Sequence, residues 1–164
     1  MTRTPTDELS HPEAQRLLRD APLLRLGYNG TDGTPRVIPI GYFWNGGEVV
    51  ICTATTAPKA RALAQRPQVA LSIDEGATPM DSKAVLIRGA AVLETVDGVA
   101  EEYIAGARKV MAPEQIPAFE EACAQMYEQM VRITIAPAWA RFFDFGAGRL
   151  PGFLERMAGE AQQR

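Results

Sequence analysis

The sequence predicts a mainly β protein in which six or seven antiparallel strands close into a small barrel, with helices added around it. Two observations predict this class. Short runs of apolar and β-branched residues recur between turn-forming residues, which is typical of strands joined as hairpins. Residues 45–47, with the sequence Asn-Gly-Gly, are a strong hairpin signal between two such runs. Antiparallel strands with short connections close readily into small barrels.

The first third of the chain is expected to hold one short helix and three strands. Ser10 and Glu13 have the spacing of a capping box and predict a helix that ends near Asp20. Glycines, an aspartate and a proline mark the turn after the first strand. The three strands are predicted over residues 22–29, 36–44 and 48–54.

The remainder is expected to alternate strands and helices. Threonines and Pro58 predict the start of a short helix within residues 53–67. Two longer helices are expected on either side of Pro113, and Gly89 is expected to mark a bulge or bend in a long strand. The helices are predicted over residues 96–111 and 113–130, and the strands over 68–74, 83–96 and, as one or two strands, 131–145.

The bulk composition fits one globular domain. The 164 residues are 46% hydrophobic and 23% charged, and we expect a core over residues 8–146 with a C-terminal tail over 147–164. The net charge of −3 argues against a nucleic acid partner. Apolar runs fall far below the roughly 20 residues of a membrane span, and the N-terminus lacks the apolar region of a secretory signal. We therefore expect a cytoplasmic protein whose cysteines, Cys52 and Cys123, are buried thiols.

Two features indicate a ligand site. Pro39 lies inside a predicted strand, and a proline cannot donate a ladder hydrogen bond, so this stretch should lie at a sheet edge or face a ligand. Lys59 and Arg61 lie in the first turn of the predicted helix, where positive charge opposes the helix macrodipole. Hydroxyls such as that of Thr53, free helix amides and these cations together form a plausible phosphate site.

Other chemistries are poorly supported. His11 is the single histidine and lies near the N-terminus, which disfavours a catalytic triad and a histidine metal site. No P-loop or dinucleotide-binding glycine motif is present. We therefore assign no metal site and no catalytic residue. A protein of this kind can still be an enzyme if a bound cofactor supplies the reactive group.

The order of these features resembles the pyridoxamine 5′-phosphate oxidase-like split β-barrel family, and within it the flavin and deazaflavin oxidoreductases. The resemblance covers about residues 8–146. It is most specific in the stretch Pro-Arg-Val-Ile-Pro-Ile at residues 35–40 and in the stretch Pro-Lys-Ala-Arg-Ala-Leu at residues 58–63. It implies a split barrel, a homodimer and a groove between subunits that binds flavin mononucleotide (FMN) or a deazaflavin. It further implies a small-molecule substrate.

The family motifs also imply roles for individual residues. Lys59 would hold the cofactor phosphate with Thr53 and Arg61, and Trp139 would approach the groove from the partner subunit. The remaining residues would lie along the ring system or line the same groove: Val37, Ile38, Pro39, Ile40, Ala54 and Thr55.

The chain also departs from the family pattern. The additional basic residues that bind pyridoxal phosphate have no convincing counterpart, the tail at residues 146–157 differs, and Ala62 stands where an asparagine is common. We therefore expect an FMN-dependent oxidoreductase that transfers hydride between the flavin and a small organic substrate. The alternatives are a deazaflavin-dependent reductase on the same fold, a non-catalytic flavin- or haem-binding protein, and a barrel without a ligand.

Overall fold

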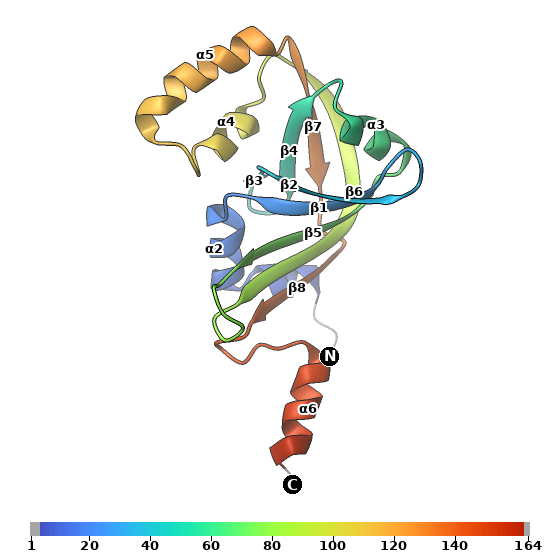
Figure 1. The fold of residues 1–164 in the computed structure, drawn as a ribbon, viewed down its shortest axis with the longest axis vertical. Coiled ribbons are helices and arrows are strands. Elements are labelled where there is room, and N and C mark those ends of the chain that lie inside the picture. Colours follow the sequence, from blue (N-terminus) through green and yellow to red (C-terminus); the bar gives the residue numbers. More distant parts are fainter. Residues whose placement is uncertain (1–3, 163–164) are drawn as a thin grey trace.

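Eight antiparallel strands form the framework of the molecule, and the computed structural model describes residues 4–162 (Figure 1). Seven strands follow one another in the order β2-β1-β5-β6-β7-β4-β3, and β8 pairs with β6. The expected antiparallel, mainly β class with added helices is confirmed. The strands are β1 (Leu24–Asn29), β2 (Pro35–Ile40), β3 (Phe43–Trp44), β4 (Val49–Ala54), β5 (Gln68–Glu75), β6 (Lys83–Asp97), β7 (Gln129–Ile135) and β8 (Trp139–Asp144).

Strand β6 joins the two parts of the framework. In its first half it pairs with β5 on one edge and β8 on the other, so that Ile87 lies opposite both Leu71 and Ala140. In its second half it pairs with β7, with Leu93 opposite Ile133. The sheet therefore divides around β6, which is the arrangement of a split barrel.

Gly89 lies where β6 leaves β8 and turns to β7. The ladder with β5 runs through this residue without a bulge, with Gly89 opposite Val69, so of the expected bulge or bend the bulge is wrong. A Cβ atom at Gly89 would lie 2.5 Å from the carbonyl oxygen of Ala136, which is far too close for a larger residue. The glycine is therefore required by the approach of two backbones.

The barrel core forms where the strands turn alternate side chains inward. Every second residue from Val69 to Ile73 in β5 is buried, whereas the neighbours between them are exposed or partly exposed. Leu17 and Leu18 of helix α2 add to the same core from one side. Burial of each large side chain stabilises the fold by about 1.5–3 kcal/mol, and this core fixes the strands that carry the site.

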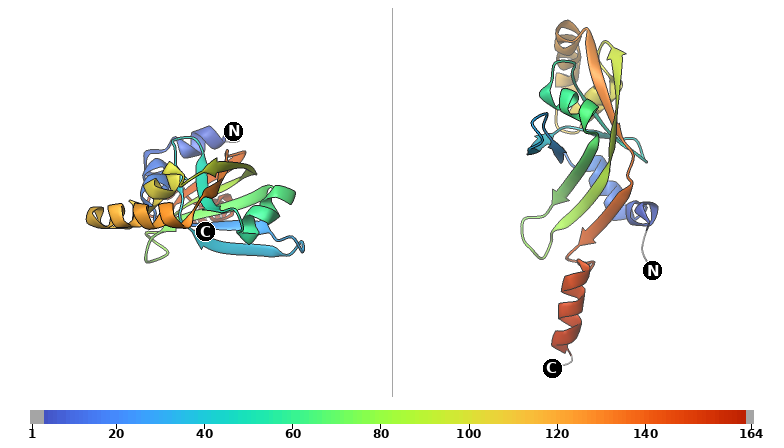
Figure 2. Two further views of the ribbon diagram at one scale, coloured as in Figure 1. Left: turned by 90° about the horizontal axis from the view of Figure 1, so that it is seen from above. Right: turned by 90° about the vertical axis from the view of Figure 1, so that its right-hand side faces the viewer.

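Helices surround the framework and leave one segment projecting. α1 packs on β8, α2 on β5 and β6, α3 on β1 and β6, and α4 on β3 and β4. Figure 2 shows α6 extending away from the rest of the molecule. No helix in the described part of the chain is long and apolar enough to cross a membrane. The helices are α1 (Pro5–Leu9), α2 (Pro12–Asp20), α3 (Pro58–Gln65), α4 (Glu101–Ala107), α5 (Ile116–Met126) and α6 (Gly152–Gln162), with a 3-10 turn η1 (Pro113–Gln115) before α5.

Several predicted boundaries are wrong. The structure has eight strands because the expected strand 36–44 breaks after Ile40 into β2 and β3, and because the segment 131–145 gives two strands. The two long helices are shorter than expected, since β6 continues to Asp97 and β7 begins at Gln129. The first predicted helix is capped by His11 rather than by Ser10, because the His11 Nδ1 atom accepts the amide hydrogen of Glu13.

Candidate functional site

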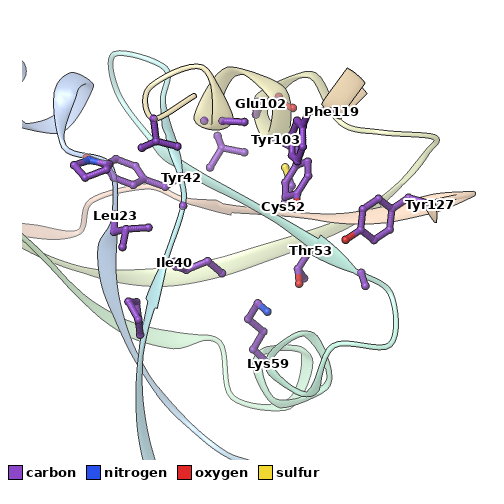
Figure 3. Close-up of a pocket in the computed structure, with 18 residues that line it drawn as sticks. Leu23, Ile40, Tyr42, Cys52, Thr53, Lys59, Glu102, Tyr103, Phe119 and Tyr127 are labelled. Atoms are coloured by element: carbon purple, nitrogen blue, oxygen red, sulfur yellow. The ribbon is translucent and has the colours of Figure 1, made fainter. Parts of the chain in front are cut away.

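A groove of about 470 Å³ lies between β2, β4, α3 and the α4–α5 segment, and it is drawn in Figure 3. Its volume is within the usual range of small-molecule sites, roughly 300–1,000 Å³. In the view of Figure 1, α3 lies on one side of β4 and α4 on the other. The lining residues are Pro22, Leu23, Pro39, Ile40, Gly41, Tyr42, Val50, Cys52, Thr53, Ala54, Lys59, Glu102, Tyr103, Gly106, Ala107, Val110, Phe119 and Tyr127.

Lys59 enters the groove from the first turn of α3. Ala60 and Leu63 of the same helix are buried against the barrel, and this packing turns Lys59 toward the cavity. Figure 3 shows its ammonium group and the hydroxyl of Thr53 pointing toward one another. Among residues 4–162 no carboxylate forms an ion pair with Lys59, and burial lowers the pKa of its ammonium group. A half-buried cation without a counter-ion is a candidate anion site.

The start of α3 adds to this site. Its N-cap residue, Ala57, provides no side-chain hydrogen bond, and no acidic side chain lies in the first turn. The amides of the first turn and the positive end of the helix dipole therefore have no anionic partner from the helix itself. Ala62, which replaces an asparagine common in the family, is buried in the packing of α3 and does not line the groove.

Strand β2 forms the opposite rim and lies at the end of the strand order. Pro39 pairs with Arg25 of β1 on one side and has no strand on its other side, so the predicted edge position is confirmed. Pro39 and Ile40 line the groove. A ring system lying here would meet the free edge of a strand.

An aromatic wall, which we define as Tyr103, Phe119 and Tyr127, closes the groove on the side away from Lys59 (Figure 3). Tyr103 stacks on Phe119 with ring centroids 5.9 Å apart, and Tyr127 meets Tyr103 edge-on at 6.0 Å. Burial raises the pKa of Tyr103 to about 12, so its hydroxyl stays protonated at neutral pH. The sequence prediction missed this wall, because only folding packs α4 on β4 and α5 against α4.

Charges near the aromatic wall are already paired. The carboxylate of Glu102 accepts a hydrogen bond of 3.1 Å from Arg132, which also pairs with Glu94 at 3.1 Å. Burial, with a smaller contribution from Glu102, raises the pKa of the neighbouring Cys52 thiol to about 11. Cys52 and Cys123 are both buried free thiols, as expected from the sequence.

Tyr42 lines the groove beside Ile40 and Gly41 and joins two segments of the chain. Its hydroxyl donates a hydrogen bond of 2.7 Å to the carbonyl oxygen of Leu18, and burial raises its pKa. The ammonium group of Lys109 lies 3.6 Å from the centre of the Tyr42 ring and donates to the carbonyl oxygen of Ala21 at 3.3 Å. These contacts fix the end of α2 and the segment after α4 to one another.

The structure brings together half of the residues that the sequence analysis assigned to the cofactor. Val37 is 70% exposed on β2, and Arg61 is exposed on α3. Trp139 lies on β8 between the guanidinium groups of Arg88 and Arg141, at 4.1 and 5.1 Å from its ring centre. The residues that line the groove are Pro39, Ile40, Thr53, Ala54 and Lys59, and those that do not are Val37, Ile38, Thr55, Arg61 and Trp139.

The single histidine is used structurally. His11 caps α2, and its ring packs on Phe142 at 4.9 Å between centroids. It does not line the groove. No group of three or more potential metal ligands occurs in the part of the chain that the structure describes.

Comparisons with known proteins agree with the fold. The family model for pyridoxamine 5′-phosphate oxidase matches residues 10–142. A conserved hypothetical protein from Mycobacterium tuberculosis is 21% identical with a TM-score of 0.69, and the match covers 92% of this chain and 94% of that one. A comparison with curated proteins gives no match.

Two further similar structures are those of proteins with a named function. An F420 reductase is 23% identical with a TM-score of 0.59, over 76% of this chain and 91% of that chain. The haem storage protein HutZ from Vibrio cholerae is 17% identical with a TM-score of 0.57, over 79% and 92%. At these identities the likeness shows a shared fold.

Proposed function

Because this chain belongs to the pyridoxamine 5′-phosphate oxidase family, we propose that it is an FMN-dependent oxidoreductase acting on a small organic substrate. The observation that supports this most strongly is Lys59, a half-buried cation at a helix start that has no carboxylate partner among the described residues. The groove beside it also has the polarity of a flavin site, with one cationic end and mostly apolar walls.

The phosphate of FMN fits the Lys59 end of the groove. A phosphate there would restore the hydrogen bonds and the counter-charge that burial denies to Lys59, and it would favour the charged form of the lysine. Each hydrogen bond to a charged group contributes about 1.5–3 kcal/mol. This exceeds the cost of a cation in the first turn of a helix, up to about 1 kcal/mol.

The residues of the chain would bind and orient the ring system. Pro39 and Ile40 would present the free edge of β2 to it, and Ala54 would lie at the end of β4 beside Thr53. The apolar side chains around the groove would exclude water from the reacting face. When bound, the flavin supplies the hydride chemistry, since no residue of the groove has the pattern of a catalytic nucleophile.

The replacement Lys59→Met tests this assignment, because it keeps much of the side-chain length and removes the charge. We expect FMN to bind about 10-fold more weakly or worse in a fluorescence titration, as the loss of one charged hydrogen bond implies. Arg61→Met is the matched control, since this arginine lies on the same helix outside the groove. Equal affinities for wild type and Lys59→Met would remove Lys59 from the site.

A deazaflavin is the second candidate cofactor, and the likeness to an F420 reductase supports it. The longer anionic tail of a deazaflavin needs basic residues beyond the phosphate site. Arg61 is available near the start of α3, whereas Arg66 donates to the carbonyl oxygens of Gly30 and Thr31. Parallel titrations with FMN and F420 distinguish the two, and we expect FMN to bind more tightly because Lys59 is the single cation among the described lining residues.

A further inference from the structure

The two ends of the groove differ in charge and in the kind of group they can hold. Lys59 and Thr53 form the polar end, and the aromatic wall forms the opposite end (Figure 3). Of the described residues that line the groove, Lys59 alone is cationic. Once the phosphate of a cofactor takes this lysine, the described lining of the groove from this chain offers no further cation for a second anion.

Two other cations on the elements around the groove have partners within the chain. Arg132 pairs with Glu102 and Glu94, both at 3.1 Å. The ammonium group of Lys109 lies over the ring of Tyr42, 3.6 Å from its centre, and donates to the carbonyl oxygen of Ala21 at 3.3 Å. A phosphate on the substrate would therefore meet the aromatic rings and the Glu102 carboxylate, and burial of an anion in such surroundings is unfavourable.

The aromatic wall offers the opposite chemistry. Tyr103 and Phe119 are nearly parallel, with 25° between their ring planes, and Tyr127 stands at 78° to Tyr103. Their contacts with one another hold the rings in place. A flat molecule can therefore stack on them or pack edge-on without the entropic cost of fixing mobile side chains. Val110, on the segment after α4, extends the same apolar surface.

We infer that the aromatic wall is the substrate side of the groove and takes a neutral, planar ring compound that carries no phosphate. This inference rests on the proposed function, because it assigns the Lys59 end to the cofactor. An oxidase of a phosphorylated vitamin takes an anionic substrate, whereas this site would take a neutral one.

A matched pair of fluorescent probes tests the inference. 2-Naphthol and 2-naphthyl phosphate share one ring system and differ by the phosphate group. Each is titrated by fluorescence anisotropy at neutral pH into the full chain saturated with FMN. We expect 2-naphthol to bind about 10-fold more tightly or better, because the phosphate finds no free cation. Equal or tighter binding of 2-naphthyl phosphate would overturn the inference.

Variants of the aromatic wall assign the binding to this end of the groove. Tyr103→Leu and Phe119→Leu should each weaken 2-naphthol binding roughly 3- to 10-fold, and Tyr103→Phe should keep it, because the ring rather than the hydroxyl makes the contact. Met126→Ala is the matched control, since this residue lies on α5 with 70% of its surface exposed, outside the groove. If both leucine variants bind 2-naphthol like wild type, the aromatic wall is not the site.

A gain of function gives a second, independent readout. The gain sought is binding of the phosphate group, which an added arginine beside the aromatic wall would provide. Val110 is 60% exposed, so an arginine can replace it without entering the core. Val110→Arg should tighten 2-naphthyl phosphate binding about 3-fold relative to 2-naphthol, so that the preference for 2-naphthol narrows. FMN titrations separate the two proposals. If the chain does not bind FMN but binds 2-naphthol in a way that depends on Tyr103, the proposed cofactor is wrong and the substrate class stands. If the chain binds FMN but shows no preference for 2-naphthol, the substrate class is wrong and the cofactor stands.

Discussion

At the scale of single residues, two lysines near the groove are charged groups that the fold partly removes from water. Burial lowers the pKa of both Lys59 and Lys109. Lys59 faces the groove, whereas Lys109 donates to a carbonyl oxygen and lies against the face of the Tyr42 ring. The same desolvation therefore indicates a ligand at Lys59 and a structural contact at Lys109.

The Lys109 contact predicts a pH dependence of stability. Burial lowers the pKa of Lys109 to about 8 in the folded state, from 10.5 as its ordinary value. Between these values the unfolded chain binds the extra proton, so this group makes folding more favourable as the pH rises. From pH ~7.5 to ~9 we expect the free energy of unfolding of wild type to gain about 0.5–1 kcal/mol relative to Lys109→Met, after allowance for partial exposure.

Urea denaturation at the two pH values measures this difference. Arg108→Met is the control, because it removes the charge of the neighbouring residue, which pairs with Glu120 and has no contact with Tyr42 or Ala21 among those of the described residues. Stability profiles of wild type and Lys109→Met that remain parallel would show that Lys109 does not lose its proton near pH ~8 in the folded protein.

At the scale of elements, helix α1 and the segment after β8 are joined by one buried carboxylate. Glu8 is 2% exposed, accepts the amide hydrogen of Phe142 at 2.9 Å and accepts a hydrogen bond from Arg149 at 2.6 Å. The Nε atom of Arg149 in turn donates to the carbonyl oxygen of Phe142 at 2.8 Å. These contacts attach the first helix to the end of the barrel opposite α5, where β8 would otherwise present an unpaired edge (Figure 1).

The replacement Glu8→Leu should lower the free energy of unfolding by about 2–4 kcal/mol, because it leaves the Arg149 guanidinium and a backbone amide without their acceptor. Glu13→Leu is the matched control. This glutamate is 38% exposed and pairs with Lys83, so its loss should cost no more than about 1 kcal/mol. The double variant Glu8→Leu/Arg149→Met should recover part of the loss in urea denaturation. Equal effects of the two single replacements would contradict a special role for Glu8.

At the scale of the whole molecule, the exposed edge of the sheet is the feature that a second copy would cover. β2 ends the strand order, and Val37 on it is 70% exposed. Trp139 lies outside the groove of its own chain, so its expected approach to a cofactor requires another subunit. We propose on these grounds that the active form is a homodimer whose groove both chains complete.

Light scattering after size exclusion tests the dimer. We expect a mass twice that of the 17.8 kDa chain, and we expect Val37→Asp to shift the protein toward the monomer, since a buried unpaired charge is costly. FMN affinity should fall with it if the partner completes the groove. Met80→Asp, at a residue 75% exposed outside the groove, is the control and should leave the mass unchanged. A monomeric wild type would refute the homodimer.

The sequence by itself determined the class of fold, the edge position of Pro39 and the place of Lys59 in the first turn of a helix. These depend on local chemistry, namely the alternation of apolar residues, the missing amide of a proline and a cation at a helix start. It also determined that the chain would resemble the flavin-binding split barrels over most of its length. Element boundaries were less predictable, because β6 and β7 extend into segments with helical composition once they pair.

Only the tertiary structure decided which residues share the groove. It left Val37, Thr55 and Arg61 outside, although each lies within two residues of a lining residue. Val37 is exposed further along the edge of β2, Thr55 follows the end of β4, and Arg61 lies on a different face of α3 from Lys59. The tertiary structure also brought Tyr103 and Phe119 to the same groove as β4, from positions about 50 and about 65 residues further along the chain. Contacts between segments so far apart depend on how the helices pack on the sheet, and no local pattern in the sequence encodes that packing.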